Sequence, residues 1–222
     1  MLVVVAVIAL LASMLLPALA RAQGAARKSQ CLSQLHQQGL AWQLYLDDHA
    51  DRFPDRRDLK ASLPGGFKPW TGWPASDPRS GWVSVLLGRT LGDLRILQCP
   101  AVASGALARA DSVWQSGPTN SPVVARANYW MWRFDRMDDP VPDDNFWGRP
   151  VSECVERLRV AGNPAAGQPD GPSAVELAVD PYFPSTIPSV PAELRGWSAH
   201  LGGRNRLMLD GHVEHFRDPR TR

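Results

Sequence analysis

The hydrophobic and polar positions divide the first 52 residues of the chain into two parts. Residues 1–20 (MLVVVAVIALLASMLLPALA) contain no charged side chain. Because a helix rises about 1.5 Å per residue, this run is about 30 Å long, the thickness of the hydrocarbon core of a bilayer. The first charges follow at Arg21, Arg27 and Lys28. The pattern predicts a membrane-spanning helix over residues 1–20.

Beyond the apolar run the pattern becomes amphipathic. Apolar or small residues recur at steps of three and four, which places them on one face of a helix: Leu32, Leu35, Gly39, Trp42 and Leu46. We therefore expect the same helix to continue over residues 21–52 and to carry a globular head, residues 53–222, on this face. Pro17 lies in the first part, where its missing N–H is expected to kink the helix or loosen a turn.

Two other interpretations of the apolar run remain open. Ala18-Leu19-Ala20 and Ala20-Arg21-Ala22 have the small-x-small form of a secretory cleavage site. Against a cleaved signal, the run is longer than a usual signal core and no basic residue precedes it. The other alternative is a buried helix of a soluble protein, but twenty uncharged residues at a terminus are hard to bury in a small domain. We favour a retained membrane helix.

The head is predicted to be rich in loops, because the chain has 20 Pro and 18 Gly residues. Short apolar and aromatic runs predict a few regular elements between the loops. These are two helices, Trp82–Leu87 and Ser152–Val160 with Ser152 as N-cap, and three extended segments, Leu94–Gln98, Asn128–Trp132 and Val175–Val179.

The last regular element predicted is a β-hairpin over residues 204–216. Arg206–Leu209 and His212–Phe216 flank the dipeptide Asp210-Gly211. Asp-Gly tolerates the two positive φ angles of a type I′ turn, which makes it a strong hairpin signal.

Charge and motifs narrow the classes of function. The net charge is +2 and the arginines are scattered, so nothing favours nucleic-acid binding. The sequence contains no nucleophile elbow, metalloprotease helix or phosphate loop, and His212 and His215 would point to opposite faces of a strand. We therefore predict no enzyme and no catalytic residue. The sequence favours a structural subunit; the alternative is a membrane-anchored or secreted binding module whose Trp-rich loop, residues 70–82, contacts a glycan or a protein.

The three cysteines, Cys31, Cys99 and Cys154, lack the close spacing of a zinc or redox site. In an exported head, one disulfide is expected and one cysteine is left over. We favour Cys31 with Cys99, which would staple the long helix to the middle of the head. Three buried free thiols are the alternative.

Both ends of the chain resemble a known family. The N-terminal segment LVVVAVIALLASMLLPALARAQGAARKSQCLSQLHQQGLAWQLYLDDHADRFP resembles the prepilin-type N-terminal methylation segment of the G-like pseudopilins of type II secretion. His200, followed after nine residues by Asp210-Gly211, resembles the C-terminal hallmark of a large bacterial branch of these proteins. Three further dipeptides and one proline also fit: Cys99-Pro100, Asn128-Tyr129, Asp180-Pro181 and Pro17, which matches the family's helix proline.

The resemblance implies an α+β, pilin-like lollipop, in which a long N-terminal helix, transmembrane in its first half, packs on a small antiparallel sheet with long loops. Such proteins lie in the bacterial inner membrane as single-pass proteins with the head in the periplasm. Assembly machinery in that membrane then stacks them, with copies of themselves and other pseudopilins, into a type II secretion or type IV pilus-like filament. The core of that filament is the bundled apolar helices.

The resemblance also bears on the start of the chain. The family's basic leader, its cleavage-site Gly and the Glu of the mature N-terminal segment would all precede Met1. Arg21, Arg27 and Lys28 follow the apolar run, and the positive-inside rule would place them in the cytoplasm unless stronger basic residues precede it. We therefore expect the true start to lie upstream.

Related pseudopilins bind calcium through a loop near the C-terminus, with the carboxylate and carbonyl oxygens that a hard cation requires. The resemblance makes Asp180 and Asp210 candidate Ca²⁺ ligands, together with an acidic run, Asp138, Asp139, Asp143 and Asp144. We favour the alternative, in which Asp210 is only the turn residue of the hairpin and the acidic run is solvated. His200 is expected to be a structural hydrogen-bonding residue beneath the hairpin rather than a ligand.

Overall fold

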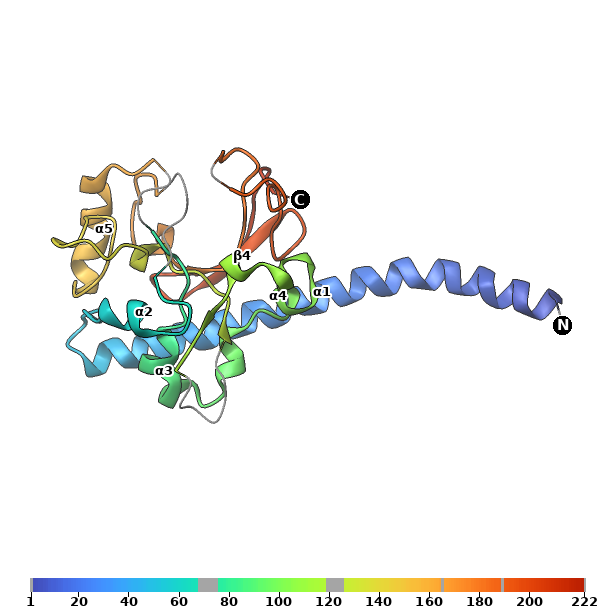
Figure 1. Cartoon of the computed structure of the whole chain (residues 1–222), viewed down its shortest axis with the longest axis horizontal. Helices are drawn as coiled ribbons and strands as arrows, with labels where there is room; N and C mark the ends of the chain where they lie inside the picture. The colour runs from blue at the N-terminus through green and yellow to red at the C-terminus, as the bar shows by residue number, and fades with distance from the viewer. Residues whose placement is uncertain (1, 68–75, 119–125, 165, 189, 222) are drawn as a thin grey trace.

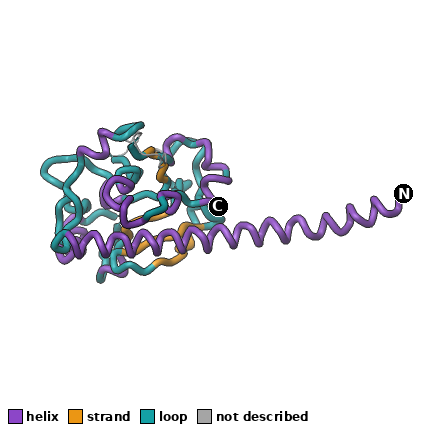
Figure 2. Tube along the Cα trace, turned by 90° about the horizontal axis from the view of Figure 1, so that it is seen from below, coloured by secondary structure: helices purple, strands orange, loops and turns teal. Residues whose placement is uncertain are grey.

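The computed structural model describes residues 2–67, 76–118, 126–164, 166–188 and 190–221. One long helix, α1 (Leu2–Asp48), carries a head built around its C-terminal part, while its N-terminal part projects away from the head (Figures 1 and 2). The head contains a small antiparallel sheet, so the layout is the α+β arrangement that the sequence predicted.

Helix α1 has 47 residues and is therefore about 70 Å long. It continues through Pro17 without interruption, and Figure 1 shows only a gentle curve in the projecting part where a kink was expected. A proline removes only its own N–H from the ladder, so the turns on either side keep their hydrogen bonds. The hydroxyl of Ser13 donates to the carbonyl of Leu10 at 2.7 Å, which satisfies this polar group within the helix.

The main sheet has three antiparallel strands in the order β3 (Glu176–Val179), β4 (Gly203–Met208), β5 (Val213–Arg217). Strand β4 lies against α1 at Gly39, where an added Cβ would come within 2.8 Å of the Leu207 side chain. A glycine on the buried face of the helix therefore permits the close approach of helix and sheet. A second sheet pairs β1 (Gln115–Ser116) with β2 (Arg126–Ala127).

The hairpin between β4 and β5 is present, but its turn is not the predicted type I′. Of the dipeptide Asp210-Gly211, only Gly211 has a positive φ, 89°. The Met208 and His212 backbones still pair, and Gly211 N–H donates to the Met208 carbonyl, so the loop has three residues and ends in a left-handed glycine. The Asp210 carboxylate accepts the N–H of His212, and this local bond holds the aspartate in an ordinary turn conformation.

The remaining elements of the described residues are short. They are the α-helices α2 (Asp58–Ser62), α3 (Val83–Leu91), α4 (Pro100–Ser104) and α5 (Val151–Ala161), and the 3₁₀ helices η1 (Leu94–Leu97), η2 (Ala106–Arg109), η3 (Asp111–Val113), η4 (Trp132–Phe134) and η5 (Pro172–Ala174).

Two of the predicted local elements and one predicted helix cap are wrong. Leu94–Gln98 is not extended, because the Asp93 carboxylate caps Arg95 N–H and starts η1. In Asn128–Trp132 only Trp130 forms bridges, to Arg79 and Val179, and η4 begins at Trp132. These aromatic residues are placed by core packing rather than by a continuous strand. Ser152 is not the N-cap of α5, since the helix begins one residue earlier, after the extended Pro150.

The core is dominated by aromatic rings that pack on α1. Trp42 is 1% exposed and its ring lies 5.6 Å from that of Phe53, 6.1 Å from that of Trp82 and 6.1 Å from that of Phe134. Rings at such spacings contribute beyond the area that they bury. The second half of α1 is thus part of the core of the head.

A disulfide joins Cys31 of α1 to Cys99 at the start of α4, with a Cα–Cα distance of 5.2 Å. This is the pairing that the sequence favoured. The third cysteine, Cys154, is free and buried, and burial raises the pKa of its thiol to about 12. The head is therefore tied to the helix covalently as well as by packing.

Candidate functional site

The projecting half of α1 presents an apolar surface. Its large hydrophobic side chains from Val3 to Leu19 are 51–76% exposed, and none of its most apolar stretch is buried. By length and composition, α1 is able to cross a membrane. An apolar surface of this extent on a monomer marks a place that lipid or other protein chains cover.

The second half of α1 has one buried face, as its spacing predicted. Leu35, Gly39 and Trp42 are buried, and Leu32 and Leu46 are half-buried. On the opposite face, Leu40 and Leu44 remain 49% and 54% exposed. These two leucines, one turn apart, form a small apolar patch beside the head, separated from the apolar surface of the projecting half by a largely polar stretch of α1.

Beneath the hairpin, His200 and Asp180 form a buried polar network. His200 Nε2 lies 3.1 Å from Asp180 Oδ2 and 3.6 Å from Cys99 Sγ. Asn205 of β4 donates its N–H to Asp180 Oδ2 and its side-chain amide to the Lys28 carbonyl of α1. Its side-chain oxygen lies 3.0 Å from His215 Nδ1. The network therefore connects the helix, β4 and β5, with His200 buried inside it; a purely structural role for His200 stays a prediction.

The other part of the C-terminal hallmark has a different role. Asp210 is exposed and lies 2.6 Å from the ring of its neighbour His212. Gly211 sits against α1, where an added Cβ would come within 2.6 Å of the Gln43 side chain. The structure thus places His200 in the core and Asp210-Gly211 at a turn on the helix surface, and the two halves of the hallmark do not share one site.

The candidate calcium ligands lie apart. Asp180 is fully buried and Asp210 is exposed on the turn. Within the described ranges, the group of three or more metal-type ligands comprises Cys31, Cys99, Asp180 and His200, and Asp210 is not a member. Most of the acidic run is engaged by arginines: Asp138 with Arg136, Asp139 with Arg57, and Asp143 with Arg149 and Arg157. These contacts do not test calcium binding, which the sequence offered as the less favoured interpretation.

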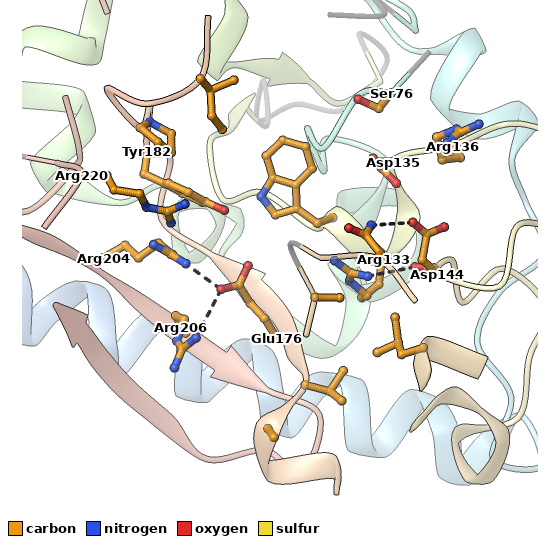
Figure 3. A pocket seen from close by; sticks show the side chains of 18 residues that line it. Ser76, Arg133, Asp135, Arg136, Asp144, Glu176, Tyr182, Arg204, Arg206 and Arg220 are labelled. Carbon is orange, nitrogen blue, oxygen red and sulfur yellow. Dashed lines mark hydrogen bonds and ion pairs between the residues drawn. The ribbon is translucent and has the colours of Figure 1, made fainter. Parts of the chain in front are cut away.

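A pocket of about 420 Å³ opens in the head, between the sheet, α5 and the segments on either side of α5 (Figure 3). Its lining combines arginines, acidic and amide groups with aromatic and aliphatic side chains: Ser76, Trp132, Arg133, Asp135, Arg136, Asp144, Leu158, Asn163, Ala166, Ala174, Val175, Glu176, Tyr182, Pro184, Ile187, Arg204, Arg206 and Arg220.

The sheet side of the pocket is a layer of arginines held by acids and rings. Arg204 lies with its guanidinium 3.9 Å from the centre of the Tyr182 ring, and Glu176 is 3.6 Å from Arg204 and 3.9 Å from Arg206. Arg204 and Arg220 also share the carboxylate of Asp218. Hydrogen bonding to Arg220 lowers the pKa of Asp218 to about 2. These arginines are therefore fixed in place with much of their charge compensated.

On the opposite side of the pocket, the described charged groups are not paired with each other in close ion pairs. Arg133 donates to the Asp144 carbonyl at 3.2 Å, and within the described part of the chain it has no carboxylate at ion-pair distance. Asp135 nearby accepts a hydrogen bond from Asn145. Burial raises the pKa of Asp135 to about 6. An incoming polar ligand would meet the Arg133 guanidinium, which has no direct ion-pair partner among the described residues, and a carboxyl group whose pKa burial raises to about 6.

Sequence reasoning missed the pocket and the contact between His200 and Asp180. The pocket draws its polar residues from segments between Ser76 and Arg220, and no short motif marks such a set. The contact between His200 and Asp180 also joins separate segments. The family resemblance included each of these residues, but nothing in the sequence indicated that they meet. In the Trp-rich loop, Trp82 is fully buried, while residues 70–75, which include Trp70 and Trp73, lie outside the described residues.

Comparison with protein-family models, with curated proteins and with solved structures finds no match for this chain.

Proposed function

We propose that this chain is a pseudopilin-like structural subunit. Residues 2–20 of α1 hold it in the bacterial inner membrane with the head in the periplasm. The same helix then assembles, with copies of itself and other pseudopilins, into a type II secretion or type IV pilus-like filament. The observation that carries the proposal is the projecting, charge-free half of α1, continuous with a helix that is built into the head.

The residue types of this helix suit such a transfer from lipid to a helical bundle. Small residues along it permit close approach between helices: Ala6, Ala9, Ala12, Ser13 and Ala18. Because residues 2–20 contain no charge, no ion has to be left unpaired when the subunit leaves the lipid. Leu40 and Leu44 supply further apolar contact beside the head.

Cross-linking between copies tests the filament. In a Cys154→Ser background, Ala9→Cys places a thiol on the projecting helix, and Val160→Cys, at a position 62% exposed on α5, serves as the matched control. Assembly through α1 predicts a ladder of cross-linked species beyond the dimer for Ala9→Cys but not for Val160→Cys. Adding Leu11→Arg should abolish the ladder, since a central arginine costs about 2.5–3.5 kcal/mol in a membrane helix, while the head keeps its melting temperature.

Two outcomes would contradict the proposal. One is a mature polypeptide that begins after Ala20 or Ala22 and is found in solution, as measured by mass spectrometry. The other is a cross-linking ladder that is the same for Val160→Cys and Ala9→Cys, because assembly would then not depend on the apolar helix.

A second candidate function, a membrane-anchored or secreted binding module, is favoured by the pocket. Its volume falls within the usual range for small-molecule sites. Its mixture of aromatic rings, arginines, acids and an amide suits a polar ligand of saccharide size. A thermal-shift screen of mono- and disaccharides should give a shift that Arg133→Gln removes and that Arg95→Gln, at an exposed position outside the pocket, leaves unchanged. No shift across the screen would count against this function.

A further inference from the structure

Four side chains from separate segments meet in the core beneath the hairpin. They are Cys31 of α1, Cys99 before α4, Asp180 after β3 and His200 before β4, and one ligand atom from each lies within 4.8 Å of the others. The first three are 0% exposed and His200 is 6% exposed. Cysteine, histidine and aspartate are the side chains that bind zinc in proteins, and four such ligands complete a tetrahedral structural site.

Two distances from His200 in this cluster are close to those between neighbouring ligands of a tetrahedral metal centre. Zinc bonds of about 2.3 Å to sulfur and 2.0–2.2 Å to nitrogen or oxygen separate neighbouring ligands by about 3.6 Å for S–N and about 3.4 Å for N–O. His200 Nε2 lies 3.6 Å from Cys99 Sγ and 3.1 Å from Asp180 Oδ2. The two sulfurs are bonded to each other in the structure, so a metal requires them to be reduced and to separate.

A second observation, independent of the cluster's composition, points to a ligand. Asp180 Oδ1 is buried and has no hydrogen-bond partner among the residues that the structure describes. Leaving a buried acceptor unsatisfied is unfavourable, and more so when the group is charged. The other oxygen, Oδ2, is held by the Asn205 N–H at 2.9 Å. This arrangement orients the carboxylate as groups behind a metal ligand do.

We propose that the cluster has a second, metal-bound state: when Cys31 and Cys99 are thiols, they bind one thiophilic divalent cation of the zinc class together with Asp180 and His200. Binding releases two protons, one from each thiol, and the two thiolates donate electron pairs to the cation. The cation and the disulfide exclude each other, because the same two sulfurs form both. Newly synthesised chain holds both cysteines as thiols, so this state needs no reductant.

A disulfide-bearing oxidant links the two states. It takes two electrons from the two metal-bound thiolates, its own S–S bond breaks, and it leaves as two thiols after taking up two protons from solvent. The Cys31–Cys99 bond forms and the cation is released. Each state ties α1 to the head at the same point, so the attachment of the helix does not depend on the redox state of the chain.

This site differs in chemistry from the calcium site that the resemblance suggests. Calcium takes six to eight oxygen ligands, whereas this cluster supplies a single carboxylate beside two sulfurs and a nitrogen. It selects a soft, four-coordinate ion.

Cobalt(II) titration of the full chain in detergent tests the proposal, because cobalt replaces zinc and reports its ligands by absorption. The reduced chain, kept free of oxygen, should bind one cobalt and show the thiolate-to-metal charge-transfer band together with the visible bands of a tetrahedral site. One equivalent of zinc should remove these bands. Cys154→Ser should bind as the wild type does, while Asp180→Asn should lose at least tenfold in affinity.

The oxidised wild-type chain provides a control that keeps the sequence unchanged, and circular dichroism checks that each sample is folded. Equal cobalt binding before and after reduction would overturn the proposal. So would binding without the charge-transfer band, or no binding by the folded, reduced chain. If Asp180→Asn does not fold, Cys31→Ser takes its place, and its spectrum should lack the two-thiolate band intensity. Wild-type intensity in Cys31→Ser would also overturn the proposal.

Discussion

The two halves of α1 are the same secondary structure in opposite surroundings. In the projecting half, Val3 is 76% exposed and Val7 is 51% exposed, whereas in the head Leu35 is 0% and Trp42 is 1% exposed. The second half is covered by specific partners: a disulfide, a glycine contact and a set of aromatic rings in edge-to-face and stacked contact. The first half presents an apolar surface without specific partners, and any apolar surroundings, lipid or protein, can bury it favourably.

This difference teaches that residue type decides the role of the first half, whereas the exact shape of side chains decides the role of the second. Substitutions of similar size should therefore have very different effects in the two halves. The predictions below use the full chain in detergent and are ordered by expected effect.

The largest effect is expected from Trp42→Ala. Removing a buried tryptophan from a packed core costs about 3–5 kcal/mol, which for a chain of this size lowers the melting temperature by about 6–20 °C. Leu11→Ala, on the projecting half of the same helix, should leave the unfolding of the head unchanged, because Leu11 is 54% exposed. Near-ultraviolet circular dichroism follows the aromatic core in both variants. Equal destabilisation would show that the two halves are not independent.

The next effect is that of the disulfide. Cys31→Ser with Cys99→Ser, measured with a chelator present, should lower stability by about 2–4 kcal/mol, because the bond closes a long loop of the unfolded chain. The two cysteines are 68 residues apart in the sequence. Cys154→Ser is the matched control, since its thiol is buried but unpaired. If the control loses as much stability as the double variant, the effect comes from packing and not from the cross-link.

A pH dependence is expected from Asp135 in the pocket. Burial raises its pKa from 3.8 to about 6, so the unfolded chain gives up this proton first as the pH rises. The contribution of Asp135 to stability is present below about pH 4 and is lost as the pH rises through 6, with a magnitude on the order of 2 kcal/mol. Asp135→Asn should therefore gain stability relative to the wild type between pH 4 and 7. Parallel stability curves for the two chains would contradict this assignment.

The smallest effect concerns the contact of the hairpin turn with α1. Gly211 and Gly202 both have a positive φ, but only at Gly211 would a Cβ meet the helix, at Gln43. Each glycine-to-alanine substitution should cost about 1 kcal/mol from the backbone conformation. Gly211→Ala should lose a few tenths more, which Gln43→Ala restores. Urea unfolding measures all three variants, and equal losses at the two glycines would mean that the turn does not press on the helix.

The sequence predicted what depends on local periodicity. The apolar half, the buried face with Leu35 and Trp42, and the position of the hairpin all follow from spacing along the chain. The sequence also favoured the Cys31–Cys99 disulfide, because that pairing ties the helix to the head, and the structure contains this pairing.

The features that the sequence did not predict have two causes. Some depend on contacts between segments that are distant in the chain, and others arise because a side chain forms a local hydrogen bond or core contact that overrides the backbone preference. The aromatic residues near Trp130 predict a strand, but core packing and the start of η4 override their β-propensity. The Asp210 side chain bonds locally and changes the type of the turn. The pocket and the meeting of Asp180 with His200 exist only once the chain is folded, and no local spacing encodes them.

The uninterrupted run of α1 from the projecting part into the head has a mechanical consequence. Because no loop separates the two parts, a pull or a torque on the far end is transmitted through helix backbone directly to the Cys31–Cys99 anchor. The head then turns as a rigid lever with the rod and cannot swing independently. Along this path one backbone hydrogen bond is missing, at Pro17, because proline has no N–H to donate.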